Sequence, residues 1–331
     1  MKKLAKILGV LVLLAVLLVG AFVAWANATY EKRLQFADTA TPNIKVEATP
    51  ELIEEGRYLV RGPAHCASCH SLTDRAHPEL IAPDSPLTGG LEFAMGPIET
   101  TWAANLTPDT ETGIGAMSDG ELARVIRTGV MRTGELSFLM KLSVAELSDH
   151  DVAAVIAYLR SLAPVKNAVK HAQWGPVGKL MLPMLNLAPD PVEGPAHVAA
   201  SAEPSIERGG YLAKHAAYCV SCHSAFDMQT LALTGPQFAG GTPEPSHGDA
   251  DKEMEYAAPN LTSDATGVTG KLTEDEFVAR MKGGRAYSSS IMPWENYREM
   301  TETDVRSIYR FLKSVPPVAH DTGPSYRPIK K

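Results

Sequence analysis

The sequence has 331 residues, a length typical of about two domains of ~150 residues each. Hydrophobic residues make up 45% of it and charged residues 21%, which excludes an intrinsically disordered chain. The net charge of −7 argues against a nucleic-acid-binding protein, because a phosphate backbone is bound by a basic surface.

The N-terminal segment combines a basic start with a long apolar run. Three lysines among the first six residues precede 20 uncharged residues, Ile7–Ala26, and about 20 helical residues span a ~30 Å hydrocarbon core. Small residues near Ala26 also fit the cleavage site of a signal peptide, whose apolar region is usually ~7–15 residues long. The length favours a retained transmembrane helix, with a signal peptide as the alternative. Both interpretations export the rest of the chain, since the lysines stay in the cytoplasm.

The exported part is an internal duplication of a module of about 115 residues. Tyr58 and Tyr211 lie 153 positions apart in similar contexts, and the Asn-Leu-Thr segment at 105–107 returns at 260–262. The predicted boundaries are 1–28 for the anchor or signal segment, 29–47 for a linker, 48–166 for domain 1, 167–204 for a Pro-rich inter-domain linker, 205–318 for domain 2 and 319–331 for a C-terminal tail.

Capping signals predict that each module is mostly helical. Ser118 and Thr273 are each followed three residues later by a Glu, which indicates a capping box at the start of a middle helix. Ser148 and Thr301 are predicted N-caps of the last helix, where apolar residues recur at helical spacing. We expect the inter-domain linker, with its six prolines, to be largely extended apart from a short helix around 178–187, and the tail to be loose.

All four cysteines lie in two Cys-x-x-Cys-His motifs, one in each module. A zinc site needs its four ligands close together, and these pairs belong to different repeats. A thioredoxin-type site follows a strand in a βαβ unit, and no such pattern is present. Two vicinal disulfides leave the histidines unexplained. The motifs are Cys66-x-x-Cys69-His70 and Cys219-x-x-Cys222-His223.

Covalent haem attachment explains every residue of both motifs. Two thiols one helical turn apart form thioethers with the haem vinyl groups, and the following His binds the iron. Bacterial haem of this type is attached outside the cytoplasmic membrane, which agrees with the export segment. The sequence therefore predicts two covalently bound haem c groups.

Met140 and Met292 are the predicted sixth iron ligands. They are the only methionine pair that recurs at the spacing of the duplication, 70 and 69 residues after the motif histidines. A Met thioether gives a six-coordinate iron with a raised potential. Met292 precedes Pro293, whereas Lys141 follows Met140 and Met131 is a nearby alternative. The fallback ligands for a bis-His iron are His65, His77, His171 and His215, and the predicted axial ligands are His70, Met140, His223 and Met292.

These motifs resemble those of class I c-type cytochromes in di-haem form. More narrowly, the chain resembles the multi-haem cytochrome c subunits of bacterial membrane-bound alcohol, aldehyde and gluconate dehydrogenases. The resemblance covers roughly residues 51–165 and 207–318, and those subunits usually carry three haem modules where this chain has two. It implies an all-α fold of two tandem cytochrome c domains after a single N-terminal transmembrane helix or signal peptide.

The family's fold implies that the first and last helices of each module cross closely. The small and aromatic partners at this crossing are expected to be Gly56 with Tyr158, and Gly209 with Phe311.

The function implied is electron relay in the periplasm. The donor is expected to be a dehydrogenase or a quinol-linked complex, and the acceptor an oxidase or a soluble cytochrome; docking by the acidic body is expected to depend on salt. The alternative is a di-haem redox enzyme, such as a peroxidase or a sulfur-compound dehydrogenase, with one open or labile haem. No catalytic residue is predicted. The expected location is the bacterial inner membrane, or the periplasm if the N-terminal segment is cleaved.

Overall fold

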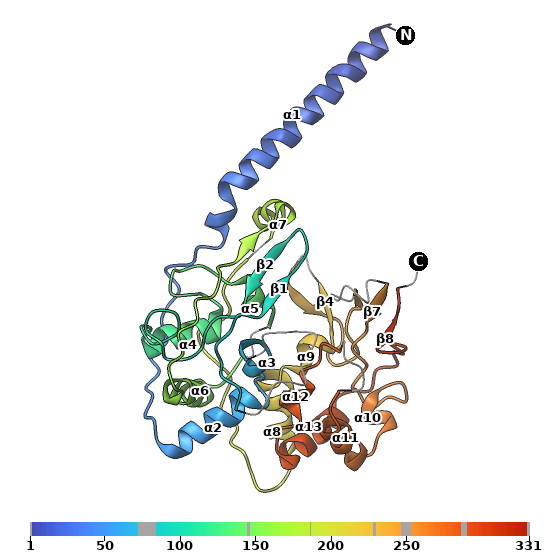
Figure 1. The fold of residues 1–331 in the computed structure, drawn as a ribbon. Coiled ribbons are helices and arrows are strands. Elements are labelled where there is room, and N and C mark those ends of the chain that lie inside the picture. The colour runs from blue at the N-terminus through green and yellow to red at the C-terminus, as the bar shows by residue number, and fades with distance from the viewer. Residues whose placement is uncertain are drawn as a thin grey trace.

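The computed structural model describes residues 2–71, 84–143, 146–185, 187–227, 230–245, 253–285 and 290–329. Figure 1 shows one long helix, α1 (Lys2–Arg33), which projects from a body built of short helices and small sheets. Most of the apolar side chains of α1 are exposed, and it has the length and composition of a membrane-spanning helix, as a signal sequence also has. The helix runs five residues into the segment predicted as a linker.

The two halves of the body repeat the same order of helices. The first half contains α2 (Pro50–Arg61), α3 (Cys66–His70), α4 (Asp119–Thr128), α5 (Phe138–Ser143) and α6 (Asp149–Ser161). The second half contains α8 (Ile206–Tyr211), the π-helical turn η3 (Leu212–Ala216), α9 (Cys219–Cys222), α10 (Val268–Lys271), α11 (Glu274–Lys282), α12 (Trp294–Tyr297) and α13 (Glu302–Ser314).

The body is helix-rich but not all-α, which corrects the predicted fold class. Three small antiparallel sheets are present: β1-β2-β3, β4-β5 and β6-β7-β8. Strands of two to four residues are too short to show an alternating pattern, so hydrophobic periodicity did not predict them. The strands are β1 (Glu92–Ala94), β2 (Glu99–Trp102), β3 (Gln173–Trp174), β4 (Ala225–Asp227), β5 (Ala232–Thr234), β6 (Glu244–Pro245), β7 (Met254–Tyr256) and β8 (Tyr326–Pro328).

The linker and the tail are more ordered than expected, because each supplies an edge strand. Strand β3 comes from the linker and pairs with β2, while β8 comes from the tail and pairs with β7. The tail is therefore not loose over β8. The short helix expected around 178–187 is present as α7 (Pro176–Met181) and the 3-10 turn η2 (Leu182–Met184).

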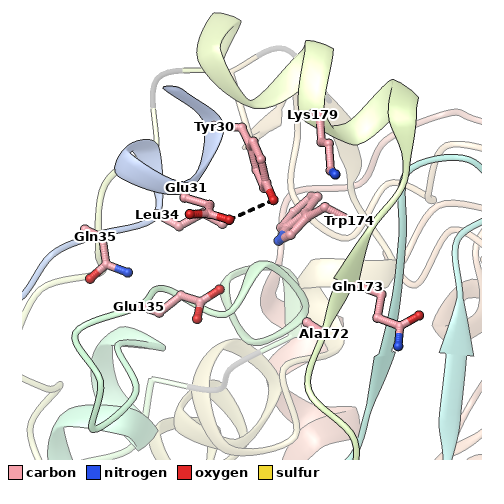
Figure 2. Close-up of a pocket in the computed structure, with 9 residues that line it drawn as sticks. All are labelled: Tyr30, Glu31, Leu34, Gln35, Glu135, Ala172, Gln173, Trp174 and Lys179. Carbon is pink, nitrogen blue, oxygen red and sulfur yellow. Dashed lines mark hydrogen bonds between the residues drawn. The ribbon is translucent and has the colours of Figure 1, made fainter. Parts of the chain in front are cut away.

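The C-terminal end of α1 is fixed to the first half of the body. The backbone of Leu34 accepts a hydrogen bond from Leu136 N at 2.8 Å, and Phe36 N donates to Gly134 O at 2.7 Å. Figure 2 shows the polar pocket at this junction, where Tyr30 from α1 and Lys179 from α7 face each other. The direction of α1 is thus set relative to this half.

The predicted helix caps are confirmed. Ser118 and Thr273 form capping boxes at the start of α4 and α11, with reciprocal bonds to the Glu three residues later. Ser148 and Thr301 cap α6 and α13, each accepting from the amide three residues on. These caps satisfy amides that a helix start leaves without partners.

The first and last helices of each half cross with their backbones in contact. A Cβ atom on Gly56 would lie 1.9 Å from the carbonyl oxygen of Ala154, and one on Gly209 would lie 1.8 Å from that of Ser307. The expected partner Tyr158 is confirmed, since its Cβ lies 2.8 Å from that position.

The expected pairing of Gly209 with Phe311 is not the nearest contact. The three atoms nearest to a Cβ built on Gly209 belong to Ser307 and Ile308, whereas the ring of Phe311 lies against Gly210, 3.1 Å from a Cβ built there. The first half has Arg57 at the position of Gly210.

Two tyrosines join the halves by equivalent hydrogen bonds, each from a tyrosine of one half to an aspartate of the other; we call this pair of bonds the tyrosine exchange. Tyr58 of the first half donates to Asp304 Oδ2 at 2.7 Å, at the start of α13. Tyr211 of the second half donates to Asp151, at the start of α6. Each pair occupies equivalent positions of the duplication, so the contact has the self-complementary character of a two-fold interface. The amides that donate to these hydroxyls belong to the N-caps Thr301 and Ser148.

The helix crossing predicts opposite effects for two neighbouring glycines. Gly209→Ala is expected to lower the free energy of unfolding by about 1–3 kcal/mol, because the new methyl group meets a backbone carbonyl that cannot move aside. Gly210→Ala is the matched control: its methyl group meets only a ring edge, and alanine favours the helix by up to ~1 kcal/mol. Denaturant unfolding followed by circular dichroism measures both, and equal losses would contradict the close crossing.

Candidate functional site

Each Cys-x-x-Cys-His motif lies on its own helical turn, directly after a sharp bend in the chain. The residue before each first cysteine has a left-handed backbone, with φ of 41° at His65 and 49° at Tyr218. These two residues are equivalent in the duplication, so the bend is a built feature of both copies. None of the four cysteines is in a disulfide.

The thiols do not have the character of reactive cysteines. Burial raises the pKa of Cys66 and of Cys219 to about 12. A redox-active thiol pair needs a lowered pKa. Each motif also follows a helix rather than the strand of a βαβ unit. Thioredoxin-like chemistry therefore does not fit.

The motif histidines are held in the form that binds a metal. The Nδ1 atom of His70 lies 2.6 Å from the carbonyl oxygen of Ala104, and that of His223 lies 2.8 Å from the carbonyl oxygen of Pro259. A proton on Nδ1 that is donated to a carbonyl leaves Nε2 unprotonated for a metal. Burial lowers the pKa of both imidazoles, which favours this neutral form.

A buried asparagine fixes the loop that supplies each carbonyl. Asn105 directly follows Ala104; its Oδ1 accepts from Thr107 N at 3.0 Å and its Nδ2 donates to Val165 O at 2.8 Å. Val165 lies just beyond α6, so the loop is tied to the end of the last helix. The sequence showed this Asn-Leu-Thr segment only as a repeat, and its role was missed. The second copy has the same bonds, from Thr262 N to Asn260 Oδ1 at 2.9 Å and from Asn260 Nδ2 to Val318 O at 2.8 Å.

The two predicted methionine ligands lie in different local structures. Met140 is half-buried within α5. Met292 is half-buried in the irregular segment before α12, packs against the core, and accepts a hydrogen bond from Trp294 N at 2.8 Å through its carbonyl. Their role as iron ligands stays a prediction. The rival Met131 lies in the turn before α5, where its amide donates to Glu135 O at 2.8 Å.

Two of the fallback histidines have protein partners. His65 Nδ1 lies 3.0 Å from Pro63 O, and His215 Nδ1 lies 3.2 Å from Glu146 Oε2. His171 is exposed, and His77 lies outside the described residues.

One buried residue between the motifs was missed by the sequence analysis. Tyr297, on α12, donates to the carbonyl oxygen of Ala217 at 2.7 Å, and its ring centre lies 5.7 Å from that of His65. Burial and the nearby Cys219 and Cys222 raise its pKa. Tyr297 therefore contacts the residue before one motif and the helix end that leads into the other. Only the packing of the two halves reveals this position.

The residues fit covalently attached haem c in both copies. Each copy offers two thiols on one helical turn and an imidazole whose Nδ1 lies at hydrogen-bond distance from a carbonyl oxygen. The same hydrogen bonds support the imidazole in each.

The hydrogen bonds by which the buried asparagine ties its loop to the end of the last helix, here called the asparagine tie, can be tested by removing the asparagine side chain. Asn260 is 1% exposed, so Asn260→Ala leaves the amide of Thr262 and the carbonyl of Val318 without their partner. Unpaired buried groups cost about 1–3 kcal/mol each, so we expect the free energy of unfolding to fall by at least about 2 kcal/mol. The exposed Asn43 is the control, and Asn43→Ala is expected to change it by less than ~0.5 kcal/mol. Denaturant titration measures both; a small effect at Asn260 would contradict the tie.

Comparison with known proteins agrees with this geometry. Residues 53–163 match the cytochrome c family model. The chain is 28% identical over 295 residues to the cytochrome c subunit of an alcohol dehydrogenase (quinone) from Gluconacetobacter polyoxogenes, which covers 84% of this chain and 58% of that protein. It is 28% identical over 285 residues to the gluconate 2-dehydrogenase cytochrome c subunit of Pantoea cypripedii, which covers 81% and 60%.

A third relative is closer in length. The diheme cytochrome c-type protein of Cereibacter sphaeroides is 25% identical over 270 residues, which covers 76% of this chain and 82% of that protein. By contrast, the chain spans about three fifths of the length of the two dehydrogenase subunits. Residues 53–163 therefore form a domain of the cytochrome c family, which implies covalently bound haem c, within a chain homologous to cytochrome c subunits of dehydrogenases and to a diheme cytochrome c.

Proposed function

We propose that the chain is a di-haem electron carrier, anchored in the bacterial inner membrane by α1, that relays electrons in the periplasm. The donor is a dehydrogenase or a quinol-linked complex, and the acceptor is an oxidase or a soluble cytochrome. The observation that carries this proposal is the duplicated histidine geometry on either side of Tyr297. Two equivalent one-electron sites that share a buried neighbour are suited to pass electrons from one to the other.

In this proposal the thiols of Cys66 and Cys69 hold one haem, and those of Cys219 and Cys222 hold the other. His70 and His223 would be the histidine ligands of the two irons, and Met140 and Met292 would be their methionine ligands. Bound haem c supplies a one-electron couple at iron, and a Met ligand raises its potential.

The protein contributes rigidity to this site. The carbonyls of Ala104 and Pro259 hold the imidazole rings through their Nδ1 atoms, and the asparagine ties fix those carbonyls. The exchange of Tyr58 and Tyr211 fixes one half against the other. A relay benefits from such fixed placement, because neither half has to reorganise when the charge on its iron changes.

The relatives suggest the class of partner. Several are cytochrome c subunits of dehydrogenases, which supports a dehydrogenase as the donor. The net charge of −7 supports docking to basic patches.

A redox enzyme with one open haem is the second candidate, and one observation favours it for the first half only. Met140 lies inside α5 next to Lys141, which binds Asp190, whereas Met292 precedes Pro293 in an irregular segment. The two distal segments have thus diverged. Carbon monoxide tests this: a shifted spectrum for one reduced haem supports the enzyme, and no shift supports the relay.

The number of haems is tested at the second motif. We expect two haems per wild-type chain and a loss or weakening of one in Cys222→Ser, because one of two thioethers can no longer form. The control Ser221→Ala changes the same turn without touching a thiol, and should keep both. Intact mass and the pyridine haemochrome spectrum give the count. An unchanged haem mass together with an unchanged pyridine haemochrome spectrum in Cys222→Ser would refute the second attachment site.

The distal ligand is tested by Met292→Ala. Loss of the thioether is expected to give a mixed-spin iron with a lower potential. Absorption spectra and a redox titration of the full chain measure both properties. Met184, which is exposed, is the control, and Met184→Ala should leave them unchanged. If Met292→Ala keeps the wild-type low-spin spectrum, another residue binds this iron.

A further inference from the structure

The duplication contains one charge difference that the haem sites do not explain. Asp151 and Asp304 are equivalent residues in the first turns of α6 and α13, and both are buried. The carboxylate of Asp304 is paired with Arg208, with Nε to Oδ1 and Nη2 to Oδ2 both at 3.1 Å. In the second half, a permanent cation therefore balances the buried charge.

The first half has the opposite charge at the position of that arginine. Glu55 is the equivalent of Arg208, so a second carboxylate stands where the duplicate has a guanidinium. Among the described residues, the arginines whose charge acts on Asp151 are engaged elsewhere: Arg127 with Asp149, and Arg208 with Asp304. Within the described part of the chain, the buried carboxylate of Asp151 thus has no arginine or lysine in direct contact.

Two histidines occupy this place instead. His197, from the segment between the halves, has its Nδ1 3.4 Å from Asp151 Oδ1. The ring centres of His197 and His150 lie 4.2 Å apart, and His150 Nε2 lies 2.6 Å from Glu55 Oε2. His150, Asp151 and His197 each offer one ligand atom, and these three atoms lie within 4.8 Å of one another.

This donor set suits a divalent transition metal. Two imidazoles and a carboxylate are common ligands of Zn²⁺. Tetrahedral ligands at ~2.0–2.1 Å from zinc lie about 3.4 Å apart, so the three groups need to close slightly. His197 lies in an irregular segment and is exposed, so it can make that movement. The carboxylates of Asp151 and Glu55 together match the charge of the ion.

We propose that His150, Asp151 and His197 form a Zn²⁺ site, with Glu55 supplying the second negative charge. The ion would balance the negative charge of Asp151, as Arg208 balances that of Asp304 in the other half. Because Asp151 also accepts the hydroxyl of Tyr211, the site joins the connecting segment to α6 at the contact between the halves. Zinc would thereby stabilise the docked arrangement. The proposal does not rest on the haem function.

The test uses the full-length, haem-loaded chain in detergent after dialysis against a chelator. Calorimetric titration with ZnCl2 is expected to show one tight equivalent per chain. His197→Ala and His150→Ala are each expected to weaken binding at least ~10-fold, as loss of a ligand does. His171→Ala removes an exposed histidine outside the cluster and should bind as the wild type does. Zinc should raise the Tm of the wild type and not that of His197→Ala, because only a bound ligand stabilises the folded state.

Glu55→Arg separates the charge argument from simple damage. This change gives the first half the arrangement of the second, so the chain should stay folded with its full haem content and lose the zinc equivalent. The absence of a saturable equivalent in the wild type would overturn the proposal. Wild-type affinity in His197→Ala would also overturn it, since binding at other histidines or at haem carboxylates does not depend on this residue. Unchanged affinity in a folded Glu55→Arg protein would remove the charge argument.

Discussion

The close crossing of the first and last helix in each half is the constraint on which the rest of the structure depends. Gly56 and Gly209 allow the backbones of α2 and α8 to touch those of α6 and α13, since any side chain there would overlap a carbonyl group. This contact sets the positions of α6 and α13 in space, and therefore the positions of both of their ends. The two ends of these helices have different roles.

The C-terminal ends position the candidate haem sites. The chain just after α6 presents the carbonyl of Val165 to Asn105, and the adjacent Ala104 orients His70. The same sequence of bonds leads from Val318 to His223 in the second half. In each half, the motif imidazole is thus linked to the end of the last helix through two hydrogen bonds.

The N-terminal ends of the same helices form the contact between the halves. Asp151 and Asp304 each accept the hydroxyl of a tyrosine from the other half. The symmetry is broken in the surrounding charges, where Glu55 stands in for Arg208 and two histidines gather beside Asp151. A duplicated chain provides its own comparison: the residues on which the copies agree fit the proposed haem sites, and the residues on which they differ carry the proposed zinc site.

The sequence by itself determined the cysteine and histidine motifs, the duplication, the helix caps and the apolar helix, because each depends on residues close together in the chain. The short strands, the placement of Phe311 against Gly210, the ordered tail, the bridging position of Tyr297 and the tyrosine exchange were decided only by the tertiary structure. The local hairpins have strands too short to show a period, and the other features join residues that lie tens to hundreds of positions apart, so neither kind of pairing leaves a periodic signal in a single sequence. The Asn-Leu-Thr segments fall between the two cases: the repeat marked them, but only the fold brings the asparagine to the end of the last helix and so gives it a purpose.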